Sequence, residues 1–233
     1  ALLDDTKVYG SIKIGDFQGK EDIRIINSAK RHTKNRIIWF EEKIEYEIDA
    51  DDKKRLTFLL KETFNLKEFL PGQFEAIQTI LNTKNDKICI MPTGSGKSLI
   101  YYFLSILQPC PSMILSPTKI LLHDQAHILV NKHDIDDIQI LDELSNHSDF
   151  DPKNKLIFLT PLTFISSNLI NRILKLNLYH GLSYFILDEV HCISNWSHDF
   201  RPEYLMISHN LKNFVDRTRL IGFTATANYT VVK

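Results

Sequence analysis

A short segment rich in glycine and hydroxyl side chains carries the groups that phosphate chemistry needs. Its residues are Pro92, Thr93, Gly94, Ser95, Gly96, Lys97 and Ser98. Such a turn presents backbone N–H groups, the Lys97 ammonium and the Ser98 hydroxyl to the phosphates of a nucleotide and to its Mg²⁺. Met91 stands where the strict GxxxxGK[ST] pattern has its first glycine. The segment therefore predicts a phosphate site built on a shorter form of that pattern.

An acidic pair further along the chain supplies the partner chemistry. Asp188 and Glu189 follow the apolar run 184–187. A carboxylate at that place can hold Mg²⁺, and a second one can orient the water that attacks the terminal phosphate. We expect Ser98 and Asp188 to bind Mg²⁺, and Lys97 to neutralise charge on the phosphates. With Glu189 orienting water, the two segments together predict an enzyme that hydrolyses a nucleoside triphosphate.

The elements that must position these groups alternate along the chain. Between the apolar runs lie segments that mostly have helical character, and this alternation predicts an α/β fold with a parallel sheet flanked by helices. The expected strands are 88–91, 112–116, 138–141, 156–160, 184–187 and 219–224. Loops at the carboxyl ends of such strands carry ligands, and the phosphate segment, Thr118, Asp188 and Thr224 all fall there. This coincidence favours a RecA-like P-loop NTPase domain.

Composition sets limits on the class of protein. Of 233 residues, 43% are hydrophobic, which suffices for one full α/β domain with something smaller attached. Lys and Arg number 28 against 29 Asp and Glu, so any argument for a nucleic-acid partner must rest on local features. No apolar run approaches the ~18 residues of a membrane span, and the start lacks a signal-peptide layout. We expect a cytoplasmic protein with no membrane partner.

Cysteine and histidine spacing gives no metal motif. Cys89, Cys110 and Cys192 form no CxxC pair, which favours reduced packing residues and predicts no zinc in this chain. His123 and His127 lie one helical turn apart, but no third ligand is nearby, so solvated or capping roles are favoured over metal binding.

The composition changes near residue 50. Before it, the segments 7–14, 22–27 and 36–48 have strand character and predict a small β-rich element over residues 1–50, of unknown role and open to a protein partner. The basic run 30–36 is either a solvated loop, which is favoured, or a tip that touches nucleic-acid phosphates. After Asp51 the apolar residues follow a helical period. These are Leu56, Leu59, Leu60 and Phe64. We therefore expect residues 51–233 to form the nucleotide-binding domain.

Several segments together resemble the RecQ family of DNA helicases, in superfamily 2. The resemblance covers about residues 64–227. It is carried by 69–77, 91–99, 116–118 with Asp124 and Gln125, 160–161, and 188–204. The last segment is the most specific, because it matches the aromatic-rich loop of that family almost residue for residue.

The resemblance implies further roles. Gln73 becomes the residue that reads adenine, since its side-chain amide offers both a donor and an acceptor, and ATP becomes the nucleotide. A plain surface glutamine after a Pro-Gly turn is the alternative. Leu70 departs from the arginine usual in the family, which leaves one contact near the nucleotide in doubt.

The resemblance also implies residues that contact DNA or couple it to ATP. They are Thr118, Trp196, Phe200, Arg201, Thr224 and Thr226, with His191 linking them to the γ-phosphate. Two aromatic faces and a guanidinium can stack on or grip exposed bases. The alternatives are aromatic side chains that belong to the core, and a histidine that only packs beside the metal.

The motifs and the resemblance together predict the first lobe of a DEAH-like, ATP-dependent DNA helicase that acts on single-stranded or partially duplex DNA in repair or recombination. The resemblance alone implies that it moves 3′→5′. A second RecA-like domain of the same longer polypeptide is expected as a partner, so this lobe alone should have little activity. The alternative from another class is a non-unwinding module that senses nucleic acid under ATP control, within a defence or repair assembly.

Overall fold

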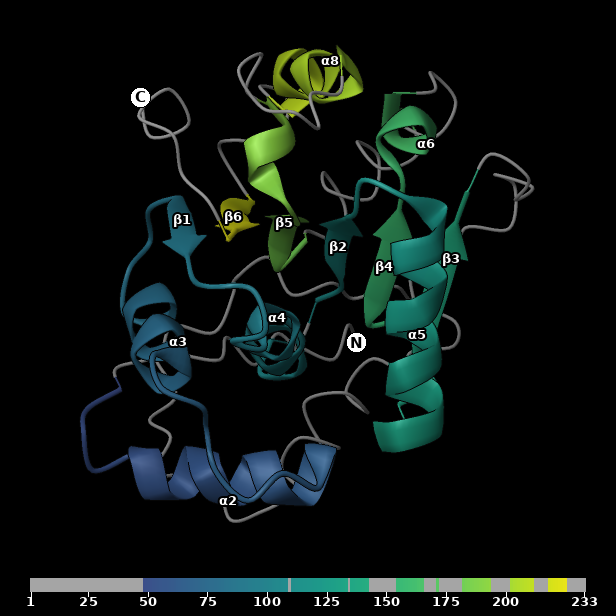
Figure 1. Cartoon of the computed structure of the whole chain (residues 1–233). Coiled ribbons are helices and arrows are strands. Elements are labelled where there is room, and N and C mark those ends of the chain that lie inside the picture. The colour runs from purple at the N-terminus through teal and green to yellow at the C-terminus, as the bar shows by residue number, and fades with distance from the viewer. Residues whose placement is uncertain are drawn as a thin grey trace, which may run out of the picture.

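Six parallel strands form one sheet in the computed structural model, which describes residues 48–108, 110–133, 135–142, 154–165, 171, 182–193, 202–211 and 218–225. The strands are β1 (Lys87–Ile90), β2 (Ser112–Leu115), β3 (Ile138–Leu141), β4 (Leu156–Leu159), β5 (Tyr184–Leu187) and β6 (Arg219–Thr224). Their spatial order is β1-β6-β5-β2-β4-β3, and every described pairing is parallel (Figure 1). The predicted α/β fold is confirmed.

The predicted strands agree with the observed ones to within one residue. Met91, Ser116 and Thr160 were expected in strands and instead begin the loops that follow β1, β2 and β4. The ladder nevertheless continues one step into two of these loops, because Met91 N donates to the Thr224 carbonyl at 3.0 Å and Ser116 N donates to the Leu159 carbonyl at 3.2 Å. The loops that bear the site therefore leave the sheet from fixed points.

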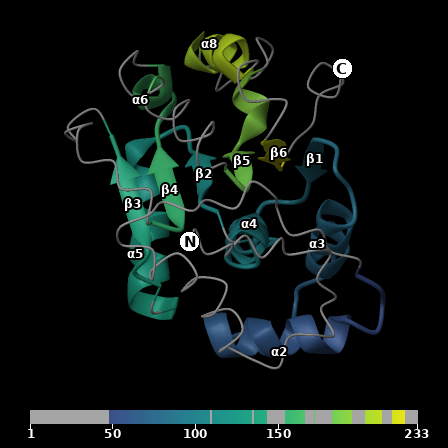
Figure 2. The same cartoon turned by 180° about the vertical axis from the view of Figure 1, so that it is seen from behind.

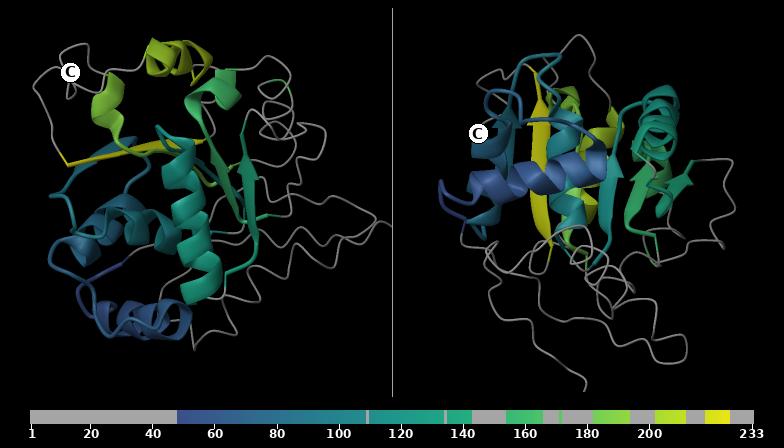
Figure 3. Two further views of the ribbon diagram at one scale, coloured as in Figure 1. Left: turned by 45° about the vertical axis from the view of Figure 1, so that its right-hand side comes forward. Right: turned by 90° about the horizontal axis from the view of Figure 1, so that it is seen from below.

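Helices cover both faces of the sheet. On one face lie α2 (Lys53–Phe64), α3 (Gln73–Leu81), α4 (Lys97–Ile106) and α5 (Lys119–His133). The other carries α6 (Pro161–Ile165), the 3₁₀ turn η3 (Val190–Ile193) and α8 (Pro202–Leu211). Figure 3 shows these two layers, with β6 in yellow between them. Seen from behind, α5 runs beside β3 and β4 (Figure 2).

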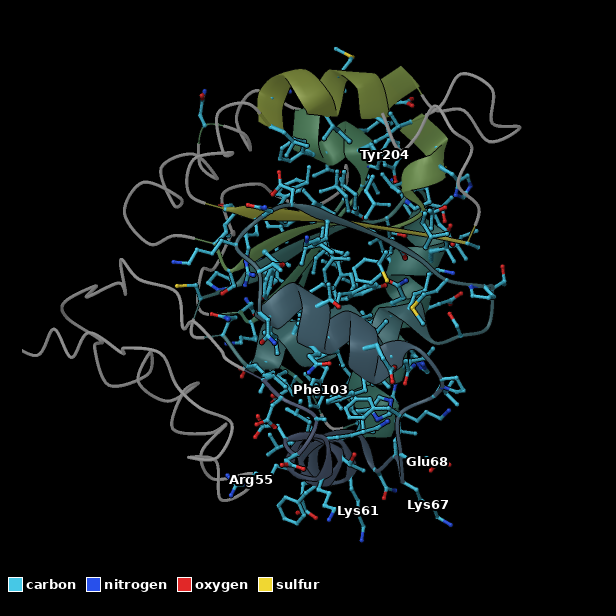
Figure 4. The ribbon with its side chains drawn as sticks, turned by 90° about the vertical axis from the view of Figure 1, so that its left-hand side faces the viewer. Arg55, Lys61, Lys67, Glu68, Phe103 and Tyr204 are labelled. Atoms are coloured by element: carbon cyan, nitrogen blue, oxygen red, sulfur yellow. The ribbon has the colours of Figure 1, made fainter. Side chains whose placement is uncertain are left out.

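The two hydrophobic cores follow the alternation of side chains along the strands. In β2, Ile114 faces α4 and α5, whereas Met113 and Leu115 face α6, η3 and α8. A strand that is buried on both faces has a continuous apolar sequence, and β2 could be predicted from such a run. Figure 4 shows Phe103 on the α4 side and Tyr204 between α8 and the sheet.

Helix α2 confirms the helical pattern predicted after Asp51. Its four predicted apolar residues, Leu56, Leu59, Leu60 and Phe64, are all buried. Just before the helix, Ile48 is tied to α3, since its carbonyl accepts from Asn82 Nδ2 at 2.7 Å and from Gln78 Nε2 at 3.0 Å. The predicted β-rich element, residues 1–50, lies outside the described residues except for residues 48–50. The domain boundary stays a prediction.

Within the described residues, no helix has both the length and the apolar character needed to cross a membrane.

Candidate nucleotide and metal site

Three adjacent strands bring the predicted site residues to one edge of the sheet. Strand β6 lies between β1 and β5, so the loop after β1, Thr224 at the end of β6, and Asp188 after β5 are neighbours. Residues 91–98 are the predicted phosphate loop, called the phosphate loop below, and their last two residues open α4, which begins at Lys97. The sequence thus places the loop at a helix N-terminus, where the helix dipole favours anions.

The backbone of the phosphate loop depends on its glycines. Gly94 and Gly96 have φ angles of +81° and +73°, in the left-handed region that other residues rarely adopt. Gly96 is restricted further, because a Cβ atom there would lie 2.5 Å from Gln73 Nε2. The loop therefore needs glycine at this position for conformation and for space.

Lys97 is buried at the base of the loop. Its side chain is 9% exposed, and its Nζ donates to the Met91 carbonyl over 3.4 Å. That distance is long for an N–H···O bond. The ammonium is therefore weakly engaged within the loop, at the place where the sequence predicts that it binds phosphate.

Gln73 contacts the phosphate loop directly. Its Nε2 donates to the carbonyls of Ser95 at 2.9 Å and Gly96 at 3.1 Å, and its Oε1 accepts from Leu70 N at 2.8 Å. The side chain is only 1% exposed. The alternative of a plain surface glutamine is therefore wrong. Adenine reading stays a prediction, and here both ends of the amide already have protein partners.

Leu70 lies on the open side of the same loop. Its side chain is 48% exposed, and its Cδ1 is 3.6 Å from the position that a Cβ on Gly96 would take. The departure from the family pattern therefore lies beside the phosphate loop.

The Asp188 carboxylate is buried and held by three donors. Tyr101 Oη and Gln125 Nε2 both donate to Oδ2, at 3.2 Å and 3.1 Å, and Glu189 N donates to Oδ1 at 3.0 Å. Burial raises the pKa of the Asp188 carboxyl, and the Glu189 charge adds to the rise, while these hydrogen bonds oppose it. The geometry fixes the direction in which the carboxylate oxygens point.

Tyr101 stands between the two expected metal ligands. Burial raises the pKa of its phenol well above the usual value, and the Asp188 charge raises it further, while a hydrogen bond with the Ser98 side chain opposes the shift. The phenol is thus neutral and remains a donor. Ser98 and Asp188 both neighbour it, which brings together the hydroxyl and carboxylate oxygens that Mg²⁺ prefers.

Glu189 and His191 contact each other beside Asp188. Glu189 has a φ of +51°, a left-handed conformation that is costly for a residue with a Cβ. Its Oε2 lies 3.1 Å from His191 Nδ1, which also lies 3.0 Å from Thr224 Oγ1. His191 therefore connects the expected water-orienting carboxylate to the end of β6. Its role as a coupling residue stays a prediction.

Close packing and a hydrogen bond from α8 also hold this acidic loop in place. Tyr204 of α8 donates through its hydroxyl to the Asp188 carbonyl at 3.1 Å (Figure 4). Gly222 of β6 faces Val190, whose methyl groups would lie 3.3 Å from any added Cβ. A larger residue at Gly222 would displace the turn that carries His191.

Thr118 has a structural role that can be seen directly. Its Oγ1 accepts from Leu121 N at 3.3 Å and its carbonyl from Leu122 N at 3.2 Å, so it caps α5. Contact of Thr118 with DNA stays a prediction. The other predicted DNA residues, Trp196, Phe200, Arg201 and Thr226, lie outside the described residues.

The histidine pair and the cysteines give no metal site in the described part of the chain. His123 and His127 are exposed on α5, and His123 Nε2 lies 3.8 Å from an Asp142 carboxylate oxygen. All three cysteines are free thiols. No group of three potential ligands occurs among the described His, Cys, Asp and Glu residues. The expected absence of zinc from the whole chain stays a prediction.

The roles of Tyr101, Gln125 and Tyr204 were missed in the sequence. A signal existed for Tyr101, because a phenol inside an otherwise apolar helix needs a hydrogen-bond partner. Gln125 belongs to a segment that carries the family resemblance, but its spacing to Asp188 has no local signature.

Comparison with known proteins assigns the family. Residues 70–233 match the family described as DEAD/DEAH box helicase. The chain belongs to this family. Among its relatives, the ATP-dependent DNA helicase Q5 of Rattus norvegicus is 34% identical over 189 residues, which cover 76% of this chain and 19% of the relative. ATP-dependent DNA helicase RecQ of Bacillus subtilis is 33% identical over 182 residues, covering 74% and 30%.

A third relative, the ATP-dependent DNA helicase hus2/rqh1 of Schizosaccharomyces pombe, is 36% identical over 195 residues, covering 77% of this chain and 14% of the relative. The resemblance to RecQ-type helicases is therefore confirmed. This helicase domain spans less than a third of the length of each of these three relatives.

Two solved structures share the fold of this helicase domain. The Pyrococcus furiosus Hef helicase domain has a TM-score of 0.52 at 19% identity, covering 69% of this chain and 34% of its own. The DUF1998 helicase MrfA has a TM-score of 0.53 at 22% identity, covering 70% and 28%.

Proposed function

We propose that this helicase domain is the ATP-binding lobe of an ATP-dependent DNA helicase of the RecQ type, which moves 3′→5′ along single-stranded DNA as it hydrolyses ATP. The observation that carries the proposal is the meeting of the phosphate loop, Asp188, Glu189 and Thr224 at the ends of three adjacent strands. The names of the relatives support DNA as the substrate and ATP as the hydrolysed nucleotide.

Ser98 and Asp188 would hold Mg²⁺. The fit rests on the donor set, because a serine hydroxyl and a buried carboxylate flank the same phenol, Tyr101. When bound, the ion neutralises charge on the β- and γ-phosphates. Tyr101, Gln125 and the Glu189 N–H hold Asp188 in one orientation before any nucleotide arrives.

Lys97 and Gln73 would change partners when ATP binds. Lys97 exchanges a long hydrogen bond to the Met91 carbonyl for contacts with the phosphates, so it gives up little. Gln73 exchanges the Ser95 and Gly96 carbonyls for the edge of adenine. The conformation of the phosphate loop would then depend on which base is bound.

Glu189 would orient the attacking water, and His191 would report that state to β6. The two side chains are already 3.1 Å apart, and His191 Nδ1 is within hydrogen-bond distance of Thr224. Thr226 follows two residues later in the chain. A change at the γ-phosphate would thus reach the loop after β6 through two contacts.

DNA would bind along the same edge of the sheet. We assign Thr118, Trp196, Phe200 and Arg201 to it, with the aromatic side chains stacking on unpaired bases. The short span relative to the relatives supports a second RecA-like domain in the same polypeptide, which would close over ATP. We also propose that a protein partner binds through residues 1–50.

Steady-state ATP hydrolysis by the natural full-length protein tests this proposal. Single-stranded DNA should stimulate the rate strongly, and single-stranded RNA should not. Trp196→Ala should keep the basal rate and lose most of the DNA stimulation. Hydrolysis that is indifferent to every nucleic acid would instead favour a non-unwinding module controlled by ATP, and unchanged stimulation in Trp196→Ala would return that side chain to the core.

A further inference from the structure

Gln125 reaches the acidic residue of the nucleotide site from a different helix. It lies on α5, whereas Asp188 follows β5, and the Gln125 Nε2 donates to Asp188 Oδ2 at 3.1 Å. Because an ionised carboxylate only accepts hydrogen bonds, this contact fixes which end of the amide faces Asp188. The Nε2 atom is the donor toward the carboxylate, and Oε1 is directed elsewhere.

The other end of the same amide lacks a partner. Gln125 Oε1 is buried, and no hydrogen-bond donor reaches it from the described part of the chain. A buried acceptor without a donor lowers the stability of the fold. This unpaired acceptor beside Asp188 would gain a donor if the metal–nucleotide complex brings one.

Helix α5 holds Gln125 firmly at this place. Thr118 caps the helix, and Leu122, Ala126 and Leu129 bury one side of it against the sheet. Gln125 lies within this anchored stretch, next to Ala126. Its amide is therefore presented by a rigid element, which positions a group better than a loop does.

A hydrated Mg²⁺ ion offers the donors that Oε1 lacks. Magnesium usually keeps several of its waters and binds protein through few carboxylates. Groups that hydrogen-bond to the ligands of a metal orient them and tune its affinity. One amide beside Asp188 can serve both purposes, with its N–H on the carboxylate and its carbonyl oxygen on a metal-bound water.

We propose that Gln125 is a positioning residue for the metal: its Nε2 orients Asp188, and its Oε1 accepts a hydrogen bond from a water of the bound Mg²⁺. This inference rests on the proposed function, because it needs a metal–nucleotide complex at this site. It adds a residue of α5, the helix that Thr118 caps, to the residues that position the ion.

Mn²⁺ binding, followed by the electron paramagnetic resonance signal of free Mn²⁺, tests the proposal without turnover. Mn²⁺ favours the same oxygen ligands as Mg²⁺. The full-length protein is titrated in the presence of a non-hydrolysable ATP analogue. Gln125→Met keeps the length of the side chain but removes donor and acceptor, and it should weaken Mn²⁺ binding by about 10–100-fold. His127→Gln, at an exposed position of the same helix, should leave the affinity unchanged.

Two further variants separate the roles. Gln125→Asn withdraws the amide by one methylene and should weaken Mn²⁺ in the same direction, even if Gln125→Met is unstable. Tyr101→Phe removes the other donor to Asp188 Oδ2 and should cost less. An equal loss in Tyr101→Phe would overturn the part of the proposal that concerns metal-bound water.

The outcomes distinguish this inference from the proposed function. Wild-type affinity for Mn²⁺ in both folded Gln125 variants, with the analogue bound normally, would overturn the inference alone. Failure of the wild-type protein to bind the analogue at all would overturn the proposed function, and the inference with it.

Discussion

The two halves of the nucleotide site are held in different ways. The phosphate half comprises residues 91–98 with Gln73, and the metal half comprises Asp188, Glu189 and His191 with the side chains that contact them. In the metal half, the Asp188 carboxylate has three donors and is 6% exposed. In the phosphate half, Lys97 Nζ donates to the Met91 carbonyl over 3.4 Å, and the Gln73 amide donates to two carbonyls of the loop itself.

This difference indicates how each half works. The metal half has its geometry before the ligand binds, which lowers the cost of reorganisation during the reaction. The phosphate half makes internal contacts that a nucleotide has to replace. Apart from removal of the Lys97 or Asp188 charge, changes in the phosphate half should therefore alter nucleotide affinity, whereas changes in the metal half should alter turnover.

Removal of the Lys97 ammonium should have the largest effect. Lys97→Ala should lower kcat/KM for ATP at least about 100-fold, because no other described cation belongs to the phosphate loop. The fold should remain, since Lys97 makes one long hydrogen bond. Steady-state hydrolysis and circular dichroism measure both quantities. Normal turnover in this variant would remove the phosphate half from the site.

Asp188→Asn tests whether the metal half acts on turnover with a geometry that exists before the ligand binds. We expect kcat to fall about 100-fold, while ATP binding in excess EDTA stays close to that of the wild type. The free energy of unfolding without metal should not fall. Burial raises the pKa of the Asp188 carboxyl in the folded protein above its value in the unfolded chain. The contribution of Asp188 to the free energy of unfolding is therefore most favourable below the unfolded pKa, and it falls as the pH rises through the folded pKa. Thermal unfolding checks this point, and marked destabilisation would contradict it.

Gln73→Ala should affect affinity more than turnover. It removes the contacts to Ser95, Gly96 and Leu70, so ATP should bind about tenfold more weakly and the preference for ATP over GTP should shrink. Competition binding with the two nucleotides measures the change. A loss of kcat with unchanged affinity would contradict the distinction between the halves.

Leu70→Arg should have the smallest effect. Leu70 is exposed beside Gly96, where an arginine could reach a bound nucleotide. We expect a gain in ATP affinity of a few-fold, of the size of one exposed charge contact. Leu70→Gln serves as the control for polarity without charge. An equal gain in both variants would show that the charge is irrelevant.

Local patterns in the sequence predicted much of the fold. Strands β2, β4 and β5 are buried on both faces and so appear as unbroken apolar runs, and α2 has its four apolar residues on one side. The phosphate loop is contiguous, and its glycines and Lys97 can be read directly. The order of the strands, which brings β6 between β1 and β5, comes from the packing of distant segments and is absent from any local window.

The contacts that orient the site were less visible. Tyr101 meets Asp188 across 87 positions of the chain, and Gln125 meets it across 63. No periodicity encodes pairs so distant in sequence. Gln73 was assigned to adenine by resemblance, and only the folded structure shows that its amide donates to carbonyls of the phosphate loop. Thr118, expected at DNA, is also the cap that fixes the start of α5.

The central claim is that the phosphate loop and Asp188 form one Mg²⁺–ATP site. Equilibrium binding of a fluorescent ATP analogue to the full-length protein, with Mg²⁺ and with EDTA, tests it most directly. The wild-type protein should bind more tightly with Mg²⁺, Asp188→Asn should lose most of that gain, and Lys97→Ala should bind weakly in both buffers. Equal binding by all three proteins, with or without metal, would contradict the account.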